Sequence, residues 1–281
     1  MGVLPQVSVI IPTLNEEEFI EKCLLGLLHQ KKSPLEIIVV DGGSTDNTIK
    51  IARKMGVKTI SKPNIGTGIA RNIGALEAKG DILAFIDADV IPHPQWCESI
   101  VNYFHKHPEI IGAAGTKIMN SKNKFLRWLY FFLTYSLQKF LLIFNFAWFS
   151  GTNVAYRKEW FIKLGGFKTT ELSEDILLSL QASRIGKMGH HGGIVYASDR
   201  RIESEGFLSF ALFYIINIFP TLRGKPIGYY PKISELKNRK KYSFIYHFKN
   251  YWKKSFVKEK KILPLSEKDN RKDLMLIENM Q

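Results

Sequence analysis

The first half of the chain alternates short apolar runs with longer stretches in which apolar residues recur at helical spacing. Residues 7–11 form the first apolar run, and residues 17–28 place apolar side chains on one helical face. The same alternation predicts strands at 35–40, 57–60 and 82–86, and helices at 46–55 and 67–78. Apolar strands separated by helices of this length predict an α/β fold with a mostly parallel sheet and right-handed crossovers.

The second half is less regular, and two of its stretches are unusually apolar. Helices are predicted at 95–107, 159–164 and 173–185, and strands at 110–117, 152–157 and 194–197. Residues 125–149 combine many aromatic residues with Arg127 and Lys139, and residues 207–219 form a shorter apolar run. The charges in the first stretch and the shortness of the second argue against membrane-spanning helices. Two interpretations stay open: core helices, or segments that lie at a membrane surface.

The charge of the chain indicates an anionic partner. Its 281 residues carry a formal net charge of +14, and residues 232–261 contain eleven basic residues against two acidic ones. Nucleic acid, anionic lipid and a phosphorylated substrate all match this charge. Because aromatic residues interleave with the lysines of that segment, we favour peripheral attachment to the inner face of the cell membrane. A hydrophobic fraction of 45% excludes wholesale disorder.

The N-terminal region and the two cysteines bear on the cellular compartment. The run at 7–11 is too short for the core of a signal peptide, and Pro12 and Asn15 follow it at once. Cys23 and Cys97 have neither a disulfide framework nor metal-ligand spacing, so we expect packed thiols. Both observations favour a cytoplasmic location.

Polar clusters follow three of the predicted strands, at 13–16, 41–44 and 87–89. In a parallel sheet such strand ends meet at one edge, where ligands bind. Asp87 and Asp89 are two residues apart, so in extended backbone both carboxylates can face one Mg²⁺ or Mn²⁺ ion that bridges a diphosphate. The alternative is a polar turn that only closes the strand.

Two glycine-containing stretches each have a structural and a functional interpretation. In residues 41–46, Asp46 is expected to cap a helix, whereas Asp41 is expected to point into the crevice and accept hydrogen bonds from a base or ribose. In residues 66–72, helix amides and Arg71 can hold phosphate oxygens, although a glycine-capped helix with a surface arginine is common. The spacing of a P-loop is absent, so neither an ATPase nor a kinase is implied.

Residues 173–175 form a further candidate site. Ser173 can cap a helix whose first turn carries Glu174 and Asp175, two acids that favour the helix dipole. Alternatively, a carboxylate here serves as a general base that accepts a proton from an incoming hydroxyl near a sugar carbon.

Together these motifs resemble family 2 glycosyltransferases of the GT-A fold. The matching stretches are VSVIIPTLNEEEFI, EIIVVDGGSTDNT, GTGIARNIG, ILAFIDADV, FSGTNVAYRKEWFIKLGGF and ELSEDILLSLQASRIG, within about residues 7–201. The resemblance implies a Rossmann-like, mostly parallel sheet flanked by helices. We expect a catalytic domain at 1–205 with an amphipathic insertion at about 121–149, followed at 206–281 by an apolar helix and a basic membrane-associating tail.

The resemblance also implies roles for individual residues. Asp89 would be the main metal ligand, with Asp87 near the ribose and the metal, and Asp175 would be the catalytic base with Glu174 beside it. Contacts to the nucleotide, the donor sugar or the acceptor would come from Pro12, Thr13, Glu16, Asp41, Arg71, Gly151, Thr152 and Asn153.

The chain departs from the family pattern after the predicted strand at 194–197. Ser198 stands near the place where members often carry histidine, so Arg200 and Arg201 would hold the diphosphate instead. The only nearby histidines, at 190 and 191, precede that strand, and we interpret them as surface or loop residues.

The resulting hypothesis is an inverting glycosyltransferase that needs Mn²⁺ or Mg²⁺ and moves a sugar from a nucleotide-diphosphate donor, UDP first and GDP second, to a hydroxyl on a lipid-linked or membrane-proximal glycan. One alternative is transfer to a polyprenyl phosphate, although Ile91 replaces the glutamine typical of that branch. Another is a basic nucleic-acid-binding protein with its footprint at 232–261. Nucleic-acid binding gives no reason for carboxylates to line one crevice, and a nucleotidyltransferase would need a glycine-rich triphosphate loop near the N-terminus.

Overall fold

The computed structural model describes residues 3–120, 123–168, 173–198 and 200. In this part of the chain, one eight-stranded sheet has the order β3-β2-β1-β4-β7-β6-β8-β5. Its strands are β1 (Val7–Thr13), β2 (Glu36–Asp41), β3 (Lys58–Ser61), β4 (Ile82–Ile86), β5 (Val90–Pro92), β6 (Ile110–Met119), β7 (Asn153–Arg157) and β8 (Lys187–Ala197). The predictions for Arg201 and for residues 206–281 lie outside the described residues.

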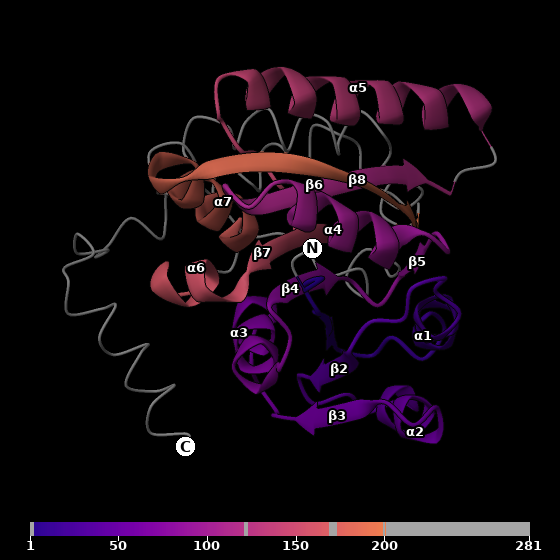
Figure 1. Cartoon of the computed structure of the whole chain (residues 1–281). Helices are drawn as coiled ribbons and strands as arrows, with labels where there is room; N and C mark the ends of the chain where they lie inside the picture. The colour runs from indigo at the N-terminus through magenta and orange to yellow at the C-terminus, as the bar shows by residue number, and fades with distance from the viewer. Residues whose placement is uncertain (1–2, 121–122, 169–172, 199, 201–281) are drawn as a thin grey trace, which may run out of the picture.

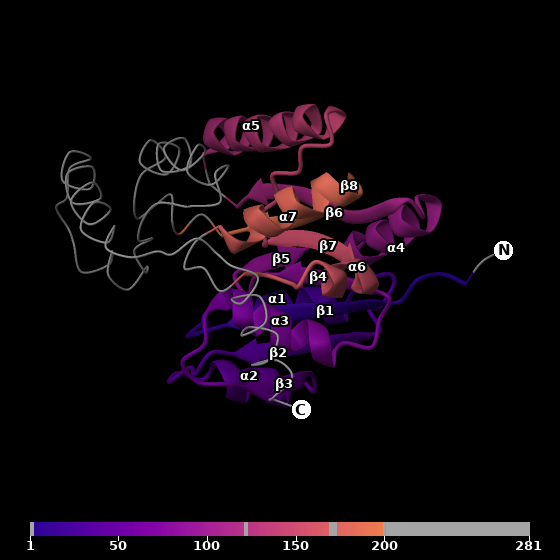
Figure 2. The same cartoon turned by 90° about the vertical axis from the view of Figure 1, so that its left-hand side faces the viewer.

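Helices cover both faces of the sheet (Figure 1). One face carries α1 (Ile20–Leu28), α2 (Thr48–Lys54) and α4 (Trp96–Lys106), and the other carries α3 (Thr67–Glu77), α6 (Lys158–Lys163) and α7 (Glu174–Ile185). The long helix α5 (Lys124–Ile143) lies over β6 and β8, at the opposite end of the sheet from β3 (Figures 1 and 2). The fold is thus a sheet between two helical layers, as the alternation predicts.

The core follows from the alternation of side chains along the strands. In β1, Val9 and Ile11 belong to the apolar cluster that includes residues of α1 and α4, whereas Ile10 belongs to the cluster under α3. A Cβ on Gly74 of α3 would overlap the side chain of Ile10, so this helix packs directly on the strand. Because these strands are buried on both faces, their sequences are continuous apolar runs.

The strand directions bring the polar strand ends together. Parallel pairing joins β1 to β2 and β4, β2 to β3, and β6 to β8, while β7 runs antiparallel to β4 and β6, and β5 antiparallel to β8. Thr13 pairs with Asp41 in the ladder, and Asp87 comes directly after β4. The mostly parallel arrangement of β1 to β4 and the meeting of their polar ends at one edge are therefore confirmed, and ligand binding at that edge stays a prediction.

Strand β8 differs from its prediction. It begins at Lys187 and includes His190 and His191, which are 8% and 5% exposed. The interpretation of these histidines as surface or loop residues was therefore wrong. Glycine and histidine are poor indicators of a strand, and three glycines interrupt this one, so the pattern concealed it. The ring Nε2 atoms of both histidines lack a hydrogen-bond partner in the described part of the chain.

Two predicted helix caps also differ in detail. Helix α2 begins at Thr48, and Asp46 accepts a 3.0 Å hydrogen bond from the N–H of that residue, so it still satisfies the helix start. Ser173 occupies the position before α7 with φ +60°, but its side chain makes no capping hydrogen bond. The prediction of a serine cap was wrong in that respect. Cys23 and Cys97 are buried free thiols, as expected.

Candidate active site

At the edge formed by the ends of β1, β2 and β4, one buried polar group lacks a hydrogen-bond partner among the described residues. The hydroxyl of Thr13 is buried and has no partner among the described residues. Pro12, beside it, is buried in β1 opposite Val40. Because buried polar groups are rarely left unpaired, an orphaned hydroxyl at a predicted ligand edge favours a bound molecule there.

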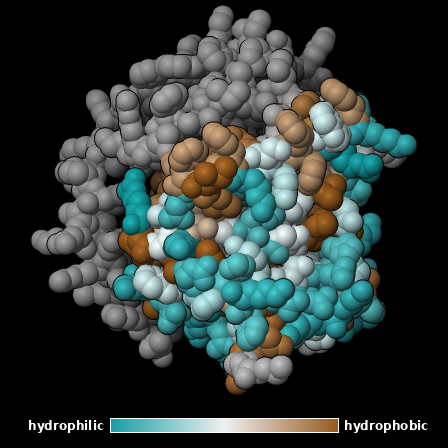
Figure 3. Space-filling model, turned by 45° about the horizontal axis from the view of Figure 1, so that its top comes forward, coloured by the Kyte–Doolittle hydropathy of each residue, from teal (hydrophilic) through white to brown (hydrophobic). Residues whose placement is uncertain are grey.

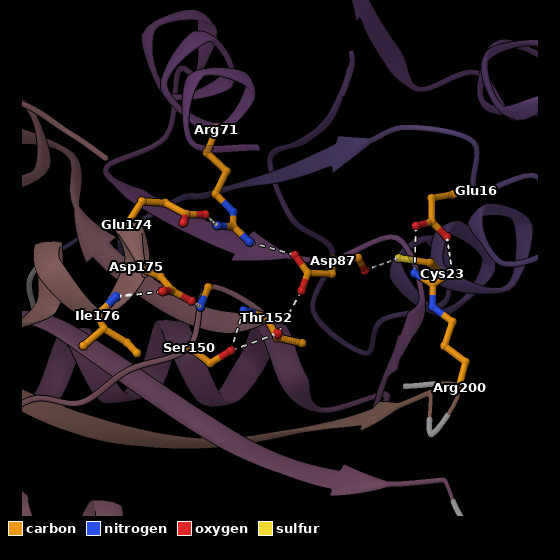
Figure 4. Close-up of polar contacts among 11 residues, drawn as sticks. Glu16, Cys23, Arg71, Asp87, Ser150, Thr152, Glu174, Asp175, Ile176 and Arg200 are labelled. Carbon is orange, nitrogen blue, oxygen red and sulfur yellow. Dashed lines mark hydrogen bonds and ion pairs between the residues drawn. The ribbon is translucent and has the colours of Figure 1, made fainter. Parts of the chain in front are cut away.

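Arg71 lies at the centre of the site (Figure 4). Its guanidinium donates to the carboxylates of Asp87 at 2.8 Å and of Glu174 at 2.9 Å, and its side chain is only 4% exposed. The centre of the Phe167 ring lies 5.3 Å from the guanidinium carbon. A residue of α3 thereby joins the end of β4 to the start of α7.

Gly151 and Thr152 complete this Arg71 cluster. The N–H of Gly151 donates to Asp175 at 2.6 Å, and the hydroxyl of Thr152 donates to Asp87 at 2.8 Å. A Cβ on Gly151 would lie 2.5 Å from the guanidinium carbon of Arg71. Only glycine fits this contact, which explains the residue type at this position.

The carboxylates of the cluster differ in proton affinity. Burial raises the pKa of Glu174 to about 7, the charge of Asp175 adds to the rise, and Arg71 offsets part of it. Burial would also raise the pKa of Asp87, but Arg71 and the Thr152 hydroxyl hold it below its ordinary value. Three carboxylates around one guanidinium leave excess negative charge, which favours the protonated form of Glu174 over its charged form.

A second arginine, Arg200, follows β8 and bridges two further acids. Its terminal N–H groups donate to Glu16 at 2.8 and 3.0 Å (Figure 4), and its Nε lies 2.9 Å from a carboxylate oxygen of Asp89. The centre of the Phe19 ring lies 4.8 Å from the guanidinium carbon. Burial raises the pKa of Asp89, and the charge of Asp87 raises it further. Asp89 thus lies in a negative environment that Arg200 partly compensates.

Asp41 is held by hydrogen bonds within the glycine turn that follows β2. Its carboxylate is 3% exposed and accepts 3.1 Å hydrogen bonds from the N–H groups of Gly43 and Ser44. The hydroxyl of Ser44 donates to the same carboxylate. The side chain therefore faces its own glycine turn and not an open crevice, and its contact to a nucleoside stays a prediction.

Asn153 is held inside the protein. Its amide oxygen accepts a 2.8 Å hydrogen bond from the indole of Trp96, and its amide nitrogen donates at 3.0 Å to the carbonyl oxygens of Thr116 and Gly193. These bonds fix the start of β7, which orients Gly151 and Thr152 at the site. A direct donor contact by Asn153 stays a prediction.

Sequence reasoning did not assign the aromatic residues of the site. Phe167 lies against Arg71 and Phe19 lies against Arg200, and each ring covers a face of a guanidinium group. Phe167 ends one of the motif stretches quoted above, which is the only signal that pointed to it. Phe19 follows the helical spacing of its segment and looks like a core residue.

Asp87 and Asp89 are the residues that fit a divalent cation. Mg²⁺ and Mn²⁺ are bound by one or two carboxylates that share the ion with substrate phosphates. A cation would also offset the negative charge that raises the pKa of Asp89. Within the described ranges, no group of three or more His, Cys, Asp or Glu side chains could hold a metal ion. The two carboxylates are of the ligand type that these ions prefer, and metal binding by them stays a prediction.

Comparison with known proteins assigns this arrangement to a family. The sequence profile described as Glycosyl transferase family 2 matches residues 8–165. The probable glycosyltransferase YdaM of Bacillus subtilis is 32% identical over 208 residues, which cover 68% of this chain and 49% of that protein. The curated relatives are matched over half of their own length or less.

Two solved structures share the fold. The mannosyltransferase PcManGT from Pyrobaculum calidifontis, in complex with GDP-Man and Mn²⁺, has a TM-score of 0.55 at 23% identity and covers 69% of this chain and 57% of its own. The glucosyl-3-phosphoglycerate synthase from Mycobacterium tuberculosis, in complex with Mn²⁺ and UDP-glucose, has a TM-score of 0.54 at 24% identity, covering 80% and 82%. The expected GT-A fold is therefore confirmed.

Proposed function

The chain belongs to glycosyl transferase family 2, a family of transferase enzymes, and from this premise we propose that it moves a sugar from a nucleotide-diphosphate donor to an acceptor hydroxyl. The observation that carries the proposal is the Arg71 cluster, in which Asp87, Glu174 and Asp175 surround one buried guanidinium. A nucleic-acid-binding protein has no use for such a group of acids at a sheet edge.

The proposed reaction is a single displacement that inverts the anomeric carbon. Asp175 accepts the proton as the acceptor O–H bond breaks, the acceptor oxygen bonds to the anomeric carbon, and the bond from that carbon to the diphosphate oxygen breaks. The N–H groups of Gly151 and Ile176 donate to the Asp175 carboxylate at 2.6 and 2.8 Å, so the base is oriented before the acceptor binds. Glu174 would contact the acceptor or the donor sugar beside it.

Asp89, together with Asp87, would hold Mn²⁺ or Mg²⁺. The bound ion would supply positive charge that stabilises the departing diphosphate. Arg71 and Arg200 would bind diphosphate oxygens, because guanidinium groups present paired N–H donors to phosphate. The support for the ion is that both solved neighbours described above contain Mn²⁺.

UDP-sugars are the first donor choice and GDP-sugars the second, the order that the resemblance of Asp41 to a nucleoside-binding residue favours, and the solved neighbours contain one donor of each class. The test is a thermal-shift panel of both classes, with and without Mn²⁺, followed by a transfer assay. Binding to the folded state raises its unfolding temperature, so the true donor should stabilise the protein only with Mn²⁺. Asp89→Asn should abolish this response, and Glu21→Gln, at an exposed position of α1, should retain it. A protein indifferent to Mn²⁺ and to every nucleotide sugar would overturn the proposal.

The nature of the acceptor has a separate test, Asp175→Asn. A hydroxyl acceptor needs a base, so transfer should fall by roughly 10²- to 10⁴-fold. Mn²⁺-dependent donor binding should persist, which separates loss of the base from loss of the site. A polyprenyl phosphate is already anionic, so activity that survives the substitution would favour that acceptor.

We also propose that the outer face of α5 binds an anionic membrane surface. No helix among the described residues has the length and apolarity needed to cross a bilayer. The outer face of α5 nevertheless exposes large apolar side chains at helical spacing, namely Phe125 (65%), Trp128 (58%), Phe132 (49%), Phe140 (56%) and Ile143 (76%). The helix contains basic residues and no acidic ones, and Figure 3 brings this side of the molecule forward, with hydrophobic side chains on its surface. Apolar and basic groups together match the headgroup region of anionic lipids.

Membrane attachment would place the acceptor site close to lipid-linked or membrane-proximal glycans. In this proposal residues 1–205 form the catalytic domain, and the tail at 206–281 adds to attachment on the inner face of the cell membrane. Vesicle flotation tests the α5 part of it. The double variant W128A/F132A should bind phosphatidylglycerol-containing vesicles roughly tenfold more weakly than the parent chain.

A matched control uses exposed apolar residues on other helices. Leu76 and Ile162 are 43% and 51% exposed, so L76A/I162A removes comparable groups and should bind vesicles as the parent does. Binding should also weaken on neutral phosphatidylcholine and at high salt. Unchanged vesicle binding by the α5 variant would contradict the proposal, and conversion of a dimer to a monomer would assign the face to a second copy instead.

A further inference from the structure

We propose that Arg200 is a resident counter-cation that occupies the Asp89 site in the nucleotide-free enzyme and transfers to the donor diphosphate when a divalent ion takes its place. The inference rests on the proposed function, because it concerns the same ion and the same diphosphate. It assigns Arg200 two successive partners, where sequence reasoning gave it only the diphosphate.

The backbone places Arg200 at this site. Val90 of β5 pairs with Ala197 of β8 in the antiparallel ladder, which puts the segment after β8 beside the segment before β5. The N–H of Ser198 then donates to the carbonyl oxygen of Asp89 at 3.3 Å. Because two backbone contacts fix the register, the approach of Arg200 to Asp89 is built into the sheet.

The guanidinium occupies the position between two carboxylates from separate loops. It binds Glu16, between β1 and α1, through both terminal N–H groups and binds Asp89 through Nε alone. The side chains of Arg200, Glu16 and Asp89 are 26%, 17% and 20% exposed. Asp87 has Arg71 as its ion-pair partner, whereas Glu16 and Asp89 both form ion pairs with Arg200.

The two contacts of Arg200 differ in how easily they exchange. The Glu16 contact is bidentate, whereas Asp89 is held by one N–H group at a partly exposed position. A divalent ion carries twice the charge of a guanidinium and competes for the Asp89 oxygen. Arg200, still paired with Glu16, would then lie next to the diphosphate that the ion binds.

The test measures Mn²⁺ and UDP binding to Arg200→Met by electron paramagnetic resonance and calorimetry. Without nucleotide, the variant should bind Mn²⁺ roughly three- to tenfold more tightly than the parent chain, because the competing cation is gone. With Mn²⁺ present, it should bind UDP roughly tenfold more weakly, because a diphosphate contact is lost. Tighter Mn²⁺ binding together with weaker UDP binding would identify Arg200 as a residue that changes partners.

Two further variants control the experiment. Arg200→Lys keeps the charge but not the bidentate geometry, so both affinities should fall between those of the parent and of Arg200→Met. Arg53→Met also removes one positive charge, at an exposed position of α2 that is distant in sequence from Arg200, and it should change neither affinity. If Arg200→Met binds Mn²⁺ no more tightly than the parent, Arg200 does not compete for Asp89, and the inference fails while the proposed function stands. If neither chain binds Mn²⁺ even with UDP, the metal site itself is wrong, and both fall.

Discussion

The two arginines of the site make similar contacts in different surroundings. Arg71 bridges Asp87 and Glu174 and lies against Phe167, and Arg200 bridges Glu16 and Asp89 beside Phe19. The side chain of Arg71 is 4% exposed, however, and that of Arg200 is 26% exposed. Arg71 belongs to a packed helix on the sheet, whereas Arg200 lies after the last described strand.

The difference in burial between the two arginines affects how much each ion pair contributes to stability and how easily it can be replaced by another partner. Arg71 is itself almost fully buried, so its removal leaves Asp87 and Glu174 without the cation that is packed between them, and the loss is large. A pair near the surface is screened by solvent and contributes little to stability. The comparison indicates that Arg71 is held more firmly in its cluster than Arg200 is, so a change of partner is easier for Arg200.

Arg71→Met should have the largest effect on stability. Asp87 and Glu174 would lose their partner inside the protein, and the free energy of unfolding should fall by about 3–5 kcal/mol. Chemical denaturation at neutral pH measures the loss. A loss below about 1 kcal/mol would show that water reaches the cluster, and the contrast with Arg200 would then disappear.

A second substitution sharpens that result. In R71M/D87N the carboxylate whose pKa is held low in the parent chain is replaced by a neutral amide, so part of the lost stability should return. The partial recovery would identify electrostatic repulsion, and not the missing packing of the arginine stem, as the main cause.

The sequence predicts the site best where the signal is local. Strands β1, β2 and β4 are apolar runs that are largely buried, and the polar residues at their ends follow directly from strand direction. The contact between Arg200 and Glu16 depends on the pairing of β5 with β8, which no spacing along the chain reveals. The hydrogen bonds that hold Asp41 were not predicted for a related reason, because the N–H donors of its glycine turn are recognised only once the turn is built.

Gly151→Ala should have the second largest effect. The new methyl group would lie 2.5 Å from the guanidinium carbon of Arg71, so the arginine or the loop must move. Overpacking of this kind lowers stability by about 1–3 kcal/mol. Thermal unfolding measures the loss, and the same substitution at Gly66, where a Cβ would have no neighbour within 4 Å, is the control. Equal effects at the two positions would contradict the close contact with Arg71.

Glu174→Gln should remove a pH dependence. Burial, with the Asp175 charge, raises the pKa of Glu174 from 4.5 to about 7, so between these values the folded state binds more protons than the unfolded state. Stability from this group is therefore present below pH 4.5 and is lost as pH rises toward 7. The parent chain should lose up to about 3 kcal/mol across this window relative to the variant, because one unit of pKa difference corresponds to about 1.4 kcal/mol. Parallel stability curves for the two chains would contradict a proton on Glu174.

Arg200→Met should change stability least, by less than about 1 kcal/mol. Its ion pairs lie near the solvent, and the ring of Phe19 remains to cover the methionine side chain. The same denaturation experiment as for Arg71→Met places both values on one scale. A loss as large as that of Arg71→Met would mean that Arg200 is part of the folded core, and a residue fixed in that way is unable to leave Asp89 when a divalent ion arrives.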